Sequence, residues 1–256
     1  MIHKMSKVKR LIILDLNGLL IHRLYKSDYV KNKRLFEDEY RLGHLARPEP
    51  KGNFAVWFRP HVKSFLDWLL EHFHVAIWSS VLQHNIAPIV ESLFPDEHER
   101  DRLLFWWNQD NCFVEEDPTA TDPKKMKSFY KRLTSVWDTV DINERWLINQ
   151  PSDVQLTDHT LLIDDNKLKV RDNPIHTAIH PRTWKLFELY DDNHNIRIYE
   201  DDTLDVNGHL RKWLRGLLEW NGTVVEYVER NPYDDPPLKE IENKSENSWD
   251  SDGQFK

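Results

Sequence analysis

Residues 11–18 read Leu11-Ile12-Ile13-Leu14-Asp15-Leu16-Asn17-Gly18. The four apolar residues that open this stretch are too few for a helix, and they do not alternate with polar residues. This pattern predicts a central strand that is covered on both faces. Asp15 follows at once, at the end of a strand where α/β proteins keep their functional side chains. The stretch therefore predicts an α/β fold whose chemistry starts at Asp15.

Strand and helix patterns alternate along the rest of the chain. Apolar residues recur at three- and four-residue spacing after Arg59-Pro60, which predicts a helix over the following turns. A second amphipathic stretch covers residues 81–95, and residues 127–137, including Lys131, also favour helix. Further short apolar runs predict strands at 74–78, 103–107, 160–163 and 177–179. The alternation predicts a mostly parallel central sheet flanked by helices.

Composition shifts divide the chain into four parts. We expect a polar leader, one α/β domain with two insertions, a helical extension that docks on the core, and a disordered acidic tail rich in Pro, Asp, Asn and Ser. The leader covers residues 1–9, the domain 10–190, its insertions about 24–56 and 114–127, the extension 191–230 and the tail 231–256. The first insertion has no clean periodicity, so we expect a mobile loop or a cover over the active edge.

Composition also excludes several classes of protein. The 256 residues suffice for one α/β domain of full size. A single cysteine, Cys112, excludes an internal disulfide and a cysteine-based zinc cage. The net charge of -8 argues against a nucleic-acid partner, because phosphate backbones attract excess Lys and Arg. No apolar stretch approaches the roughly 20 residues that cross a bilayer. We therefore expect an intracellular monomer, nuclear or cytoplasmic, without a membrane span.

Polar residues follow three of the predicted strands. They are Asp15 with Asn17, then Ser79, and then Asp164 with Asp165. Any one of them, taken alone, is best explained as a turn former or a helix cap. The carboxyl ends of neighbouring parallel strands, however, meet in one crevice. Their joint placement therefore predicts a single functional site.

The residue types at this predicted site suit phosphoryl chemistry. A carboxylate nucleophile and a phosphate ester are both anionic, so a cation must lie between them, and Mg²⁺ prefers oxygen ligands such as those of Asp15 and Asp165. A lysine near the phosphoryl group would offset developing charge, and Lys131 is the candidate. Ser79 would donate its hydroxyl to a phosphate oxygen, and Asp164 would orient the lysine from behind. Nearby cations leave the choice of lysine open; they are Lys125, Lys127 and Arg132.

The ordered set of motifs resembles the catalytic domain of the FCP/SCP family. That family, also called NLI-interacting-factor-like, belongs to the haloacid-dehalogenase-like phosphatases and contains phosphatases of the RNA polymerase II carboxy-terminal domain. The resemblance covers most of residues 10–185, and two further segments resemble plant and fungal members. The segments that carry it are 11–18, 59–62 with 77–79, 131–133 and 162–171, and the plant- and fungal-type segments are 106–112 and 225–233.

The resemblance implies a Mg²⁺-dependent phosphoaspartate mechanism. It assigns the nucleophile to Asp15, the metal to Asp15, Asp165 and the carbonyl of Asn17, and the phosphate to Ser79 and Lys131. A phosphorylated protein would be the substrate or partner. The resemblance also places Asp164 near the lysine.

Position 17 departs from the pattern of the family's active members. There, an Asp protonates the leaving oxygen and then activates water, whereas the amide of Asn17 has no proton to exchange. Because positioned acid-base groups contribute roughly 10² to 10⁴ in rate, we expect a phosphatase with weakened turnover. A catalytically dead pseudophosphatase that binds phosphorylated segments is the alternative. A presequence-binding module, like the family's import-receptor branch, is a further alternative, but the sequence shows neither a transmembrane span nor a targeting peptide.

Overall fold

A five-stranded parallel sheet forms the centre of the molecule in the computed structural model, which describes residues 8–43, 45–119, 126–189 and 196–240. Its strand order is β10-β9-β1-β5-β6, and every neighbouring pair is parallel. The strands are β1 (Leu11–Leu14), β5 (His74–Trp78), β6 (Leu103–Trp107), β9 (Thr160–Ile163) and β10 (Ala178–Ile179). The predicted α/β class with a parallel sheet is confirmed.

The two faces of β1 enter two separate cores, as the two-residue period of a strand requires. Ile12 and Leu14 belong to a large apolar cluster shared with α3, α4, α8 and α9, whereas Leu11 and Ile13 belong to a second cluster shared with α6 and α7. All four β1 side chains are fully buried. The helices are α3 (Val62–His72), α4 (Gln83–Leu93), α5 (Glu97–Asp101), α6 (Leu133–Trp137), α7 (Val140–Leu147), α8 (His209–Glu219) and α9 (Val224–Arg230).

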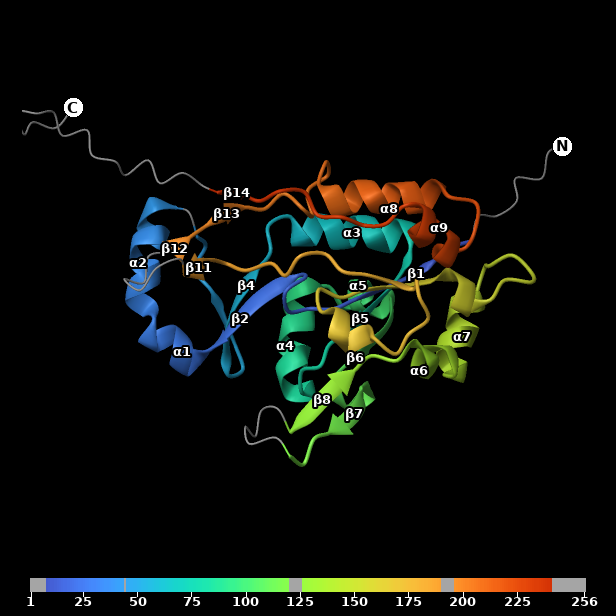
Figure 1. Cartoon of the computed structure of the whole chain (residues 1–256), viewed down its shortest axis with the longest axis horizontal. Coiled ribbons are helices and arrows are strands. Elements are labelled where there is room, and N and C mark those ends of the chain that lie inside the picture. Colours follow the sequence, from blue (N-terminus) through green and yellow to red (C-terminus); the bar gives the residue numbers. More distant parts are fainter. Residues whose placement is uncertain (1–7, 44, 120–125, 190–195, 241–256) are drawn as a thin grey trace, which may run out of the picture.

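The insertion at 24–56 is folded, not the mobile loop considered from the sequence. It holds two helices and most of a three-stranded antiparallel sheet of order β2-β4-β3. Phe36 of the insertion and Trp57, the residue that follows it, belong to a separate apolar cluster that they share with Leu186 and Ile198 from the distant 180–200 region. The elements are β2 (Ile21–Tyr25), α1 (Lys26–Lys31), α2 (Lys33–Leu42), β3 (Glu49–Lys51) and β4 (Phe54–Phe58). They lie at one end of the molecule (Figure 1).

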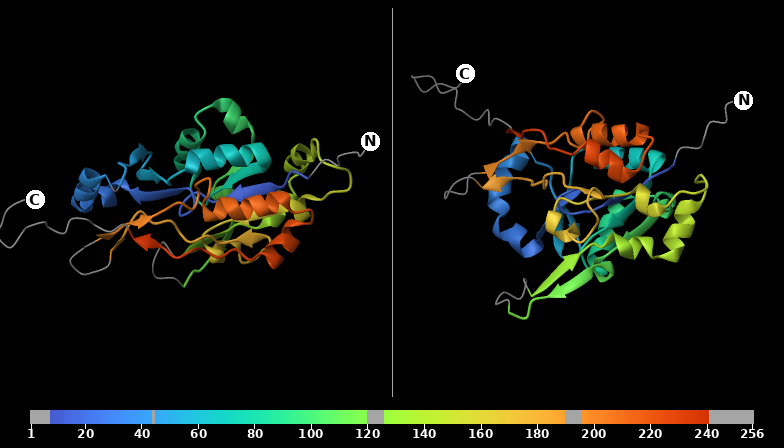
Figure 2. Two further views of the ribbon diagram at one scale, coloured as in Figure 1. Left: turned by 90° about the horizontal axis from the view of Figure 1, so that it is seen from above. Right: turned by 45° about the vertical axis from the view of Figure 1, so that its right-hand side comes forward.

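The second insertion forms an antiparallel hairpin that projects from the body of the protein (Figures 1 and 2). Its strands are β7 (Phe113–Glu116) and β8 (Lys127–Tyr130), so the helix predicted from residue 127 begins only at Leu133. Pairing of Phe113 with Tyr130 holds the segment extended, and this partner lies outside any local window of sequence. Lys131 therefore stands in the link between β8 and α6, not on a helix. Residues 120–125 lie outside the described residues.

The C-terminal extension docks through helices α8 and α9. Buried Arg10 fixes them to the start of β1, since its Nη2 donates to the carbonyl oxygens of Trp220 at 2.6 Å and Gly222 at 2.9 Å. Beyond them, residues 231–240 are ordered against the domain where we expected disorder. The strand β14 (Lys239–Glu240) pairs with β13 (Tyr199–Glu200), and the backbone N–H of Arg182 donates to Asp235. Residues 1–7 and 241–256 lie outside the described residues.

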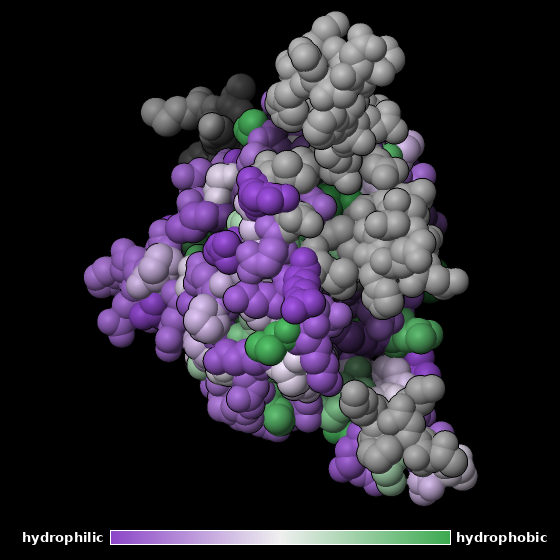
Figure 3. Space-filling view, turned by 90° about the vertical axis from the view of Figure 1, so that its left-hand side faces the viewer, coloured by the Kyte–Doolittle hydropathy of each residue, from purple (hydrophilic) through white to green (hydrophobic). Residues whose placement is uncertain are grey.

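Two observations concern the outside of the molecule. The end formed by the first insertion and by β11 (Glu188–Leu189), β12 (Ile196–Arg197), β13 and β14 is mostly hydrophilic where it is drawn in colour, with scattered hydrophobic residues (Figure 3). Among the described residues, none of the helices has the length and apolar character needed to cross a membrane.

Candidate functional site

Three neighbouring strands end at the same rim of the sheet. Leu14 of β1 is in register with Ile77 of β5 and Ile163 of β9, so the residues after these strands lie side by side. The backbone N–H of Asp15 donates to the carbonyl of Ile163 at 2.9 Å, which links the end of β1 to the end of β9. The structure thus brings the predicted polar strand ends to one rim.

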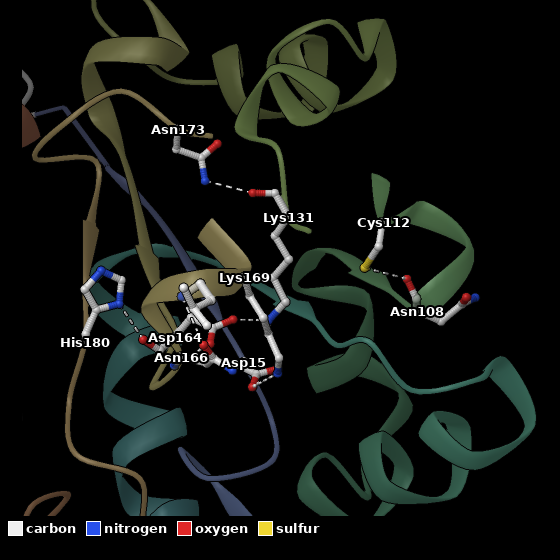
Figure 4. Close-up of polar contacts among 10 residues, drawn as sticks. Asp15, Asn108, Cys112, Lys131, Asp164, Asn166, Lys169, Asn173 and His180 are labelled. Atoms are coloured by element: carbon white, nitrogen blue, oxygen red, sulfur yellow. Dashed lines mark hydrogen bonds and ion pairs between the residues drawn. The ribbon is translucent and has the colours of Figure 1, made fainter. Parts of the chain in front are cut away.

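Lys131 lies at the centre of this rim and is fully buried. Its Nζ donates to Oδ1 of Asp15 at 2.8 Å and to Oδ2 of Asp164 at 2.6 Å (Figure 4). Its backbone is fixed as well, because its N–H donates to the carbonyl of Lys169 at 2.7 Å and its carbonyl accepts from Asn173 at 2.8 Å. An ammonium group is therefore held rigidly between two buried carboxylates.

The other candidate cations lie elsewhere. Lys127 pairs with Glu116 at 2.9 Å, and Arg132 pairs with Asp172 at 2.9 Å, both near the surface. Lys125 lies outside the described residues. Of the cations left open by the sequence and described by the structure, Lys131 alone reaches the strand ends.

Lys169 is a second cation at the site, and sequence reasoning gave it no role. It stands on the short 3₁₀ turn η3 (Lys167–Val170), and its Nζ lies 3.4 Å from Oδ2 of Asp15. Both lysines point toward Asp15 (Figure 4). Burial alone would raise the pKa of Asp15, but the two ammonium groups outweigh it and hold that pKa below its ordinary value. The negative charge of Asp15 in turn raises the pKa of Lys169.

Three carboxylates are close enough to share one metal ion. One oxygen from each of Asp15, Asp164 and Asp165 lies within 4.8 Å of the others. This oxygen-only donor set suits Mg²⁺. Asp164 already uses both oxygens, because Oδ2 accepts from Lys131 and Oδ1 accepts from the backbone N–H of Asn166 at 2.9 Å. Oδ1 of Asp165 accepts no hydrogen bond among the described residues, and Oδ2 of Asp15 has only the 3.4 Å contact with Lys169. The geometry therefore favours these two carboxylates as the ligands, with Asp164 holding Lys131.

Asp165 packs directly on the turn that follows β1. Gly18 has a φ of +85°, and a Cβ atom there would lie 2.8 Å from Cγ of Asp165 and 3.0 Å from Cγ2 of Thr183. Thr183 donates its hydroxyl to Oδ2 of Asp165 at 2.6 Å, and the next residue, Trp184, donates its N–H to the Gly18 carbonyl at 2.7 Å. Burial, together with the nearby negative charges, raises the pKa of Asp165. Gly18 thus has a specific task, which is to let this carboxylate approach the backbone.

The two remaining predicted residues lie at the rim without a contact to the lysines. Asn17 is in the turn after β1, and its Oδ1 is buried without a hydrogen-bond partner among the described residues. Ser79 is buried, and its N–H donates to the Trp107 carbonyl at 3.0 Å. Within the described part of the chain, its hydroxyl makes no hydrogen bond to Asp15 or Lys131. Among the described residues, neither side chain is therefore engaged by Asp15 or by a lysine.

A cavity of about 460 Å³ lies next to the site, and one of the residues that line it is Thr183, which bonds Asp165. Its lining comes from residues within 182–185, 199–209 and 235–239, and from Arg59. Arg59 forms a buried ion pair there with Asp201. None of the carboxylates or lysines around Asp15 lines it. We therefore place the candidate chemistry at the strand ends and not in this cavity.

The family comparison matches most of the chain. Residues 10–200 fit the model described as NLI interacting factor-like phosphatase. An uncharacterized FCP1 homology domain-containing protein of Schizosaccharomyces pombe is 24% identical over 172 residues, which is 67% of this chain and 60% of that protein. A CTD phosphatase-like protein of Invertebrate iridescent virus 3 is 25% identical over 158 residues, 59% of this chain and 74% of that one.

The solved structures that the comparison matches include fission yeast Fcp1, described as an RNA polymerase II CTD phosphatase, bound to beryllium fluoride. It has 14% identity and a TM-score of 0.45, and the match covers 82% of this chain and 51% of that one. A further structure of Fcp1 has 15% identity, the same TM-score of 0.45, and coverage of 84% and 55%. This chain spans about half the length of those two chains.

Proposed function

Because the chain belongs to the NLI interacting factor-like phosphatase family, we propose that it is a Mg²⁺-dependent phosphoaspartate-type phosphatase whose turnover is weakened by Asn17. A phosphorylated Ser or Thr side chain of a protein is the proposed substrate, and the nucleus or the cytoplasm the proposed location. One observation carries the proposal. It is the buried arrangement of Asp15, Lys131 and Asp164 beside Asp165.

Asp15 would attack phosphorus through one carboxylate oxygen, and the bond from phosphorus to the ester oxygen would break. The attack needs an ionised carboxylate, and the two lysines favour that form by lowering the pKa of Asp15. Lys131 and Ser79 would bind the transferring phosphoryl group, with Asp164 holding Lys131 in place. Asp15, Asp165 and the carbonyl of Asn17 would hold Mg²⁺, which when bound offsets the repulsion between nucleophile and phosphate.

Asn17 limits the reaction at both proton transfers. Its amide N–H groups are not acidic enough to protonate the leaving oxygen at accessible pH, and the amide is not basic enough to take a proton from the water that cleaves the phosphoaspartate. The loss of a positioned acid-base group costs roughly 10² to 10⁴ in rate. Esters with an acidic leaving group need less protonation, so an activated aryl phosphate should react faster than a phosphoserine peptide.

Phosphate release from an aryl phosphate in the presence of Mg²⁺ tests the proposal. We expect release by the wild-type protein and none above background by Asp15→Asn. The control is Asp153→Asn at an exposed position with a φ of +68°, which Asn accepts readily. Wild-type release rates in Asp15→Asn would show that Asp15 is not the nucleophile.

Asn17 also favours a second function, that of a pseudophosphatase that holds a phosphorylated segment without cleaving it. Asn is nearly isosteric with Asp, and the Oδ1 of Asn17 is buried with no bond to the lysines among the described residues, so phosphate binding should survive. Calorimetry with a phosphopeptide and its unphosphorylated twin tests this alternative. Phospho-dependent binding without turnover supports it, and equal binding of both peptides counts against it.

A further inference from the structure

We propose that Lys169 is a tethered cation that occupies the metal position when Mg²⁺ is absent, and that Mg²⁺ must displace it in order to bind. This inference rests on the proposed function, because it assumes that the acidic strand ends take the metal. It adds a residue that competes with the ion and so sets the affinity of the site.

The contacts of Asp15 carry the first step. Lys131 occupies its Oδ1 at 2.8 Å, and Lys169 occupies its Oδ2 at 3.4 Å. Both oxygens of this carboxylate are therefore engaged by ammonium groups. A divalent ion that binds Oδ2 of Asp15 therefore competes with the Lys169 ammonium for that oxygen.

Burial decides which lysine leaves. The side chain of Lys131 is 0% exposed and bonds a second carboxylate, that of Asp164 at 2.6 Å. The side chain of Lys169 is 24% exposed, and its contact with Asp15 is the longer of the two. Lys169 can therefore turn toward solvent without leaving a charge buried, whereas Lys131 cannot. Displacement of Lys169 is the cheaper route.

The charge of the site points the same way. With all groups ionised, the three carboxylates and two lysines carry one net negative charge. A divalent ion that replaces the Lys169 ammonium brings the site to neutrality. The same ion added beside both ammonium groups would leave an excess positive charge in a buried place, which is unfavourable. The charges of these groups therefore cancel when Mg²⁺ is bound and the Lys169 ammonium has moved away from Asp15.

The test is calorimetric titration of the full chain with Mg²⁺ alone. Lys169→Met keeps most of the length of the side chain and removes its charge, so we expect the variant to bind Mg²⁺ roughly tenfold more tightly than the wild type, or tighter still. Lys167→Met is the matched control, because this neighbouring lysine is exposed, and its affinity should equal that of the wild type. Lys169→Gln serves as a second variant if the first does not fold.

A thermal unfolding series supplies a second readout. Without Mg²⁺, Lys169→Met should unfold at a lower temperature than the wild type. Added Mg²⁺ should raise the midpoint temperature of the variant by more than it raises that of the wild type. Equal or weaker Mg²⁺ binding by both position-169 variants overturns this inference alone. Absence of Mg²⁺ binding to the wild type and to every variant overturns the proposed function together with it.

Discussion

Replacement of the central lysine by methionine tests the energetics of the site. In Lys131→Met the chain keeps a side chain of similar size, but Asp15 and Asp164 lose the cation between them. Both carboxylates are at most 1% exposed, so neither can turn to water. Removal of one partner from a buried ion pair costs about 3 to 5 kcal/mol. We expect a loss of that size in the free energy of unfolding at neutral pH.

The pH dependence supplies a second signature. In the wild type the pKa of Asp15 is lowered, so its contribution to stability is present above its ordinary pKa of 3.8 and is lost as pH falls below it. Without Lys131, only one lysine, Lys169, still opposes the effect of burial on Asp15, so the pKa of Asp15 rises and mild acid protonates it, which relieves part of the unpaired negative charge. The stability gap between variant and wild type should therefore narrow from about pH 8 to about pH 5.

Urea unfolding followed by circular dichroism measures both effects. Lys127→Met, at an exposed and partly paired lysine, is the control and should change stability by less than about 1 kcal/mol. The double variant Lys131→Met with Asp164→Asn should regain part of the loss, because it removes one stranded charge. A loss below about 1 kcal/mol in Lys131→Met, or a gap that widens in acid, would refute this account of the site.

Two further substitutions probe the turn after β1 and the strand β2. Gly18→Ala places a methyl group against the Asp165 carboxylate at a φ of +85°. It should weaken Mg²⁺ binding in calorimetry and lower the free energy of unfolding by at least about 1 kcal/mol. Unchanged Mg²⁺ binding would contradict the packing described for this turn. Burial lowers the pKa of His22 from 6.5 to about 4. The unfolded chain therefore takes up a proton at a higher pH than the folded protein does, and the free energy of unfolding falls as pH drops from about 6.5 to about 4. In urea unfolding, the free energy of unfolding of His22→Phe should therefore fall by about 2 to 3 kcal/mol less than that of the wild type between about pH 6.5 and about pH 4.5. An identical pH profile for the two proteins would show that His22 is not buried in its neutral form.

The central sheet could be predicted because its strands are short apolar runs that end in polar residues. β1 and β9 show this pattern within a few residues, and their parallel pairing follows from the intervening helices. The hairpin of β7 and β8 could not be found in this way. Phe113 and Tyr130 meet across a long connection, and the segment around Tyr130 has no local feature that excludes a helix.

Within the site, the acidic strand ends were predictable and their supports were not. Asp15, Asp164 and Asp165 each follow a strand, and strand ends converge by a general rule. Lys169 reaches Asp15 only because a 3₁₀ turn follows β9, and the helical spacing of residues 167–170 after an Asn cap was the one local signal for it. Thr183 contacts Asp165 through the path of a connection without regular structure, for which the sequence carries no signal.

The central claim is that the site around Asp15 holds every group that the reaction needs except the residue that transfers protons. The most direct test compares Asn17→Asp with the wild type in steady-state hydrolysis of a phosphoserine peptide with Mg²⁺. If the claim is correct, the added carboxyl group raises turnover by roughly 10² to 10⁴. Turnover that stays at the wild-type level in a folded, Mg²⁺-binding Asn17→Asp protein would contradict it.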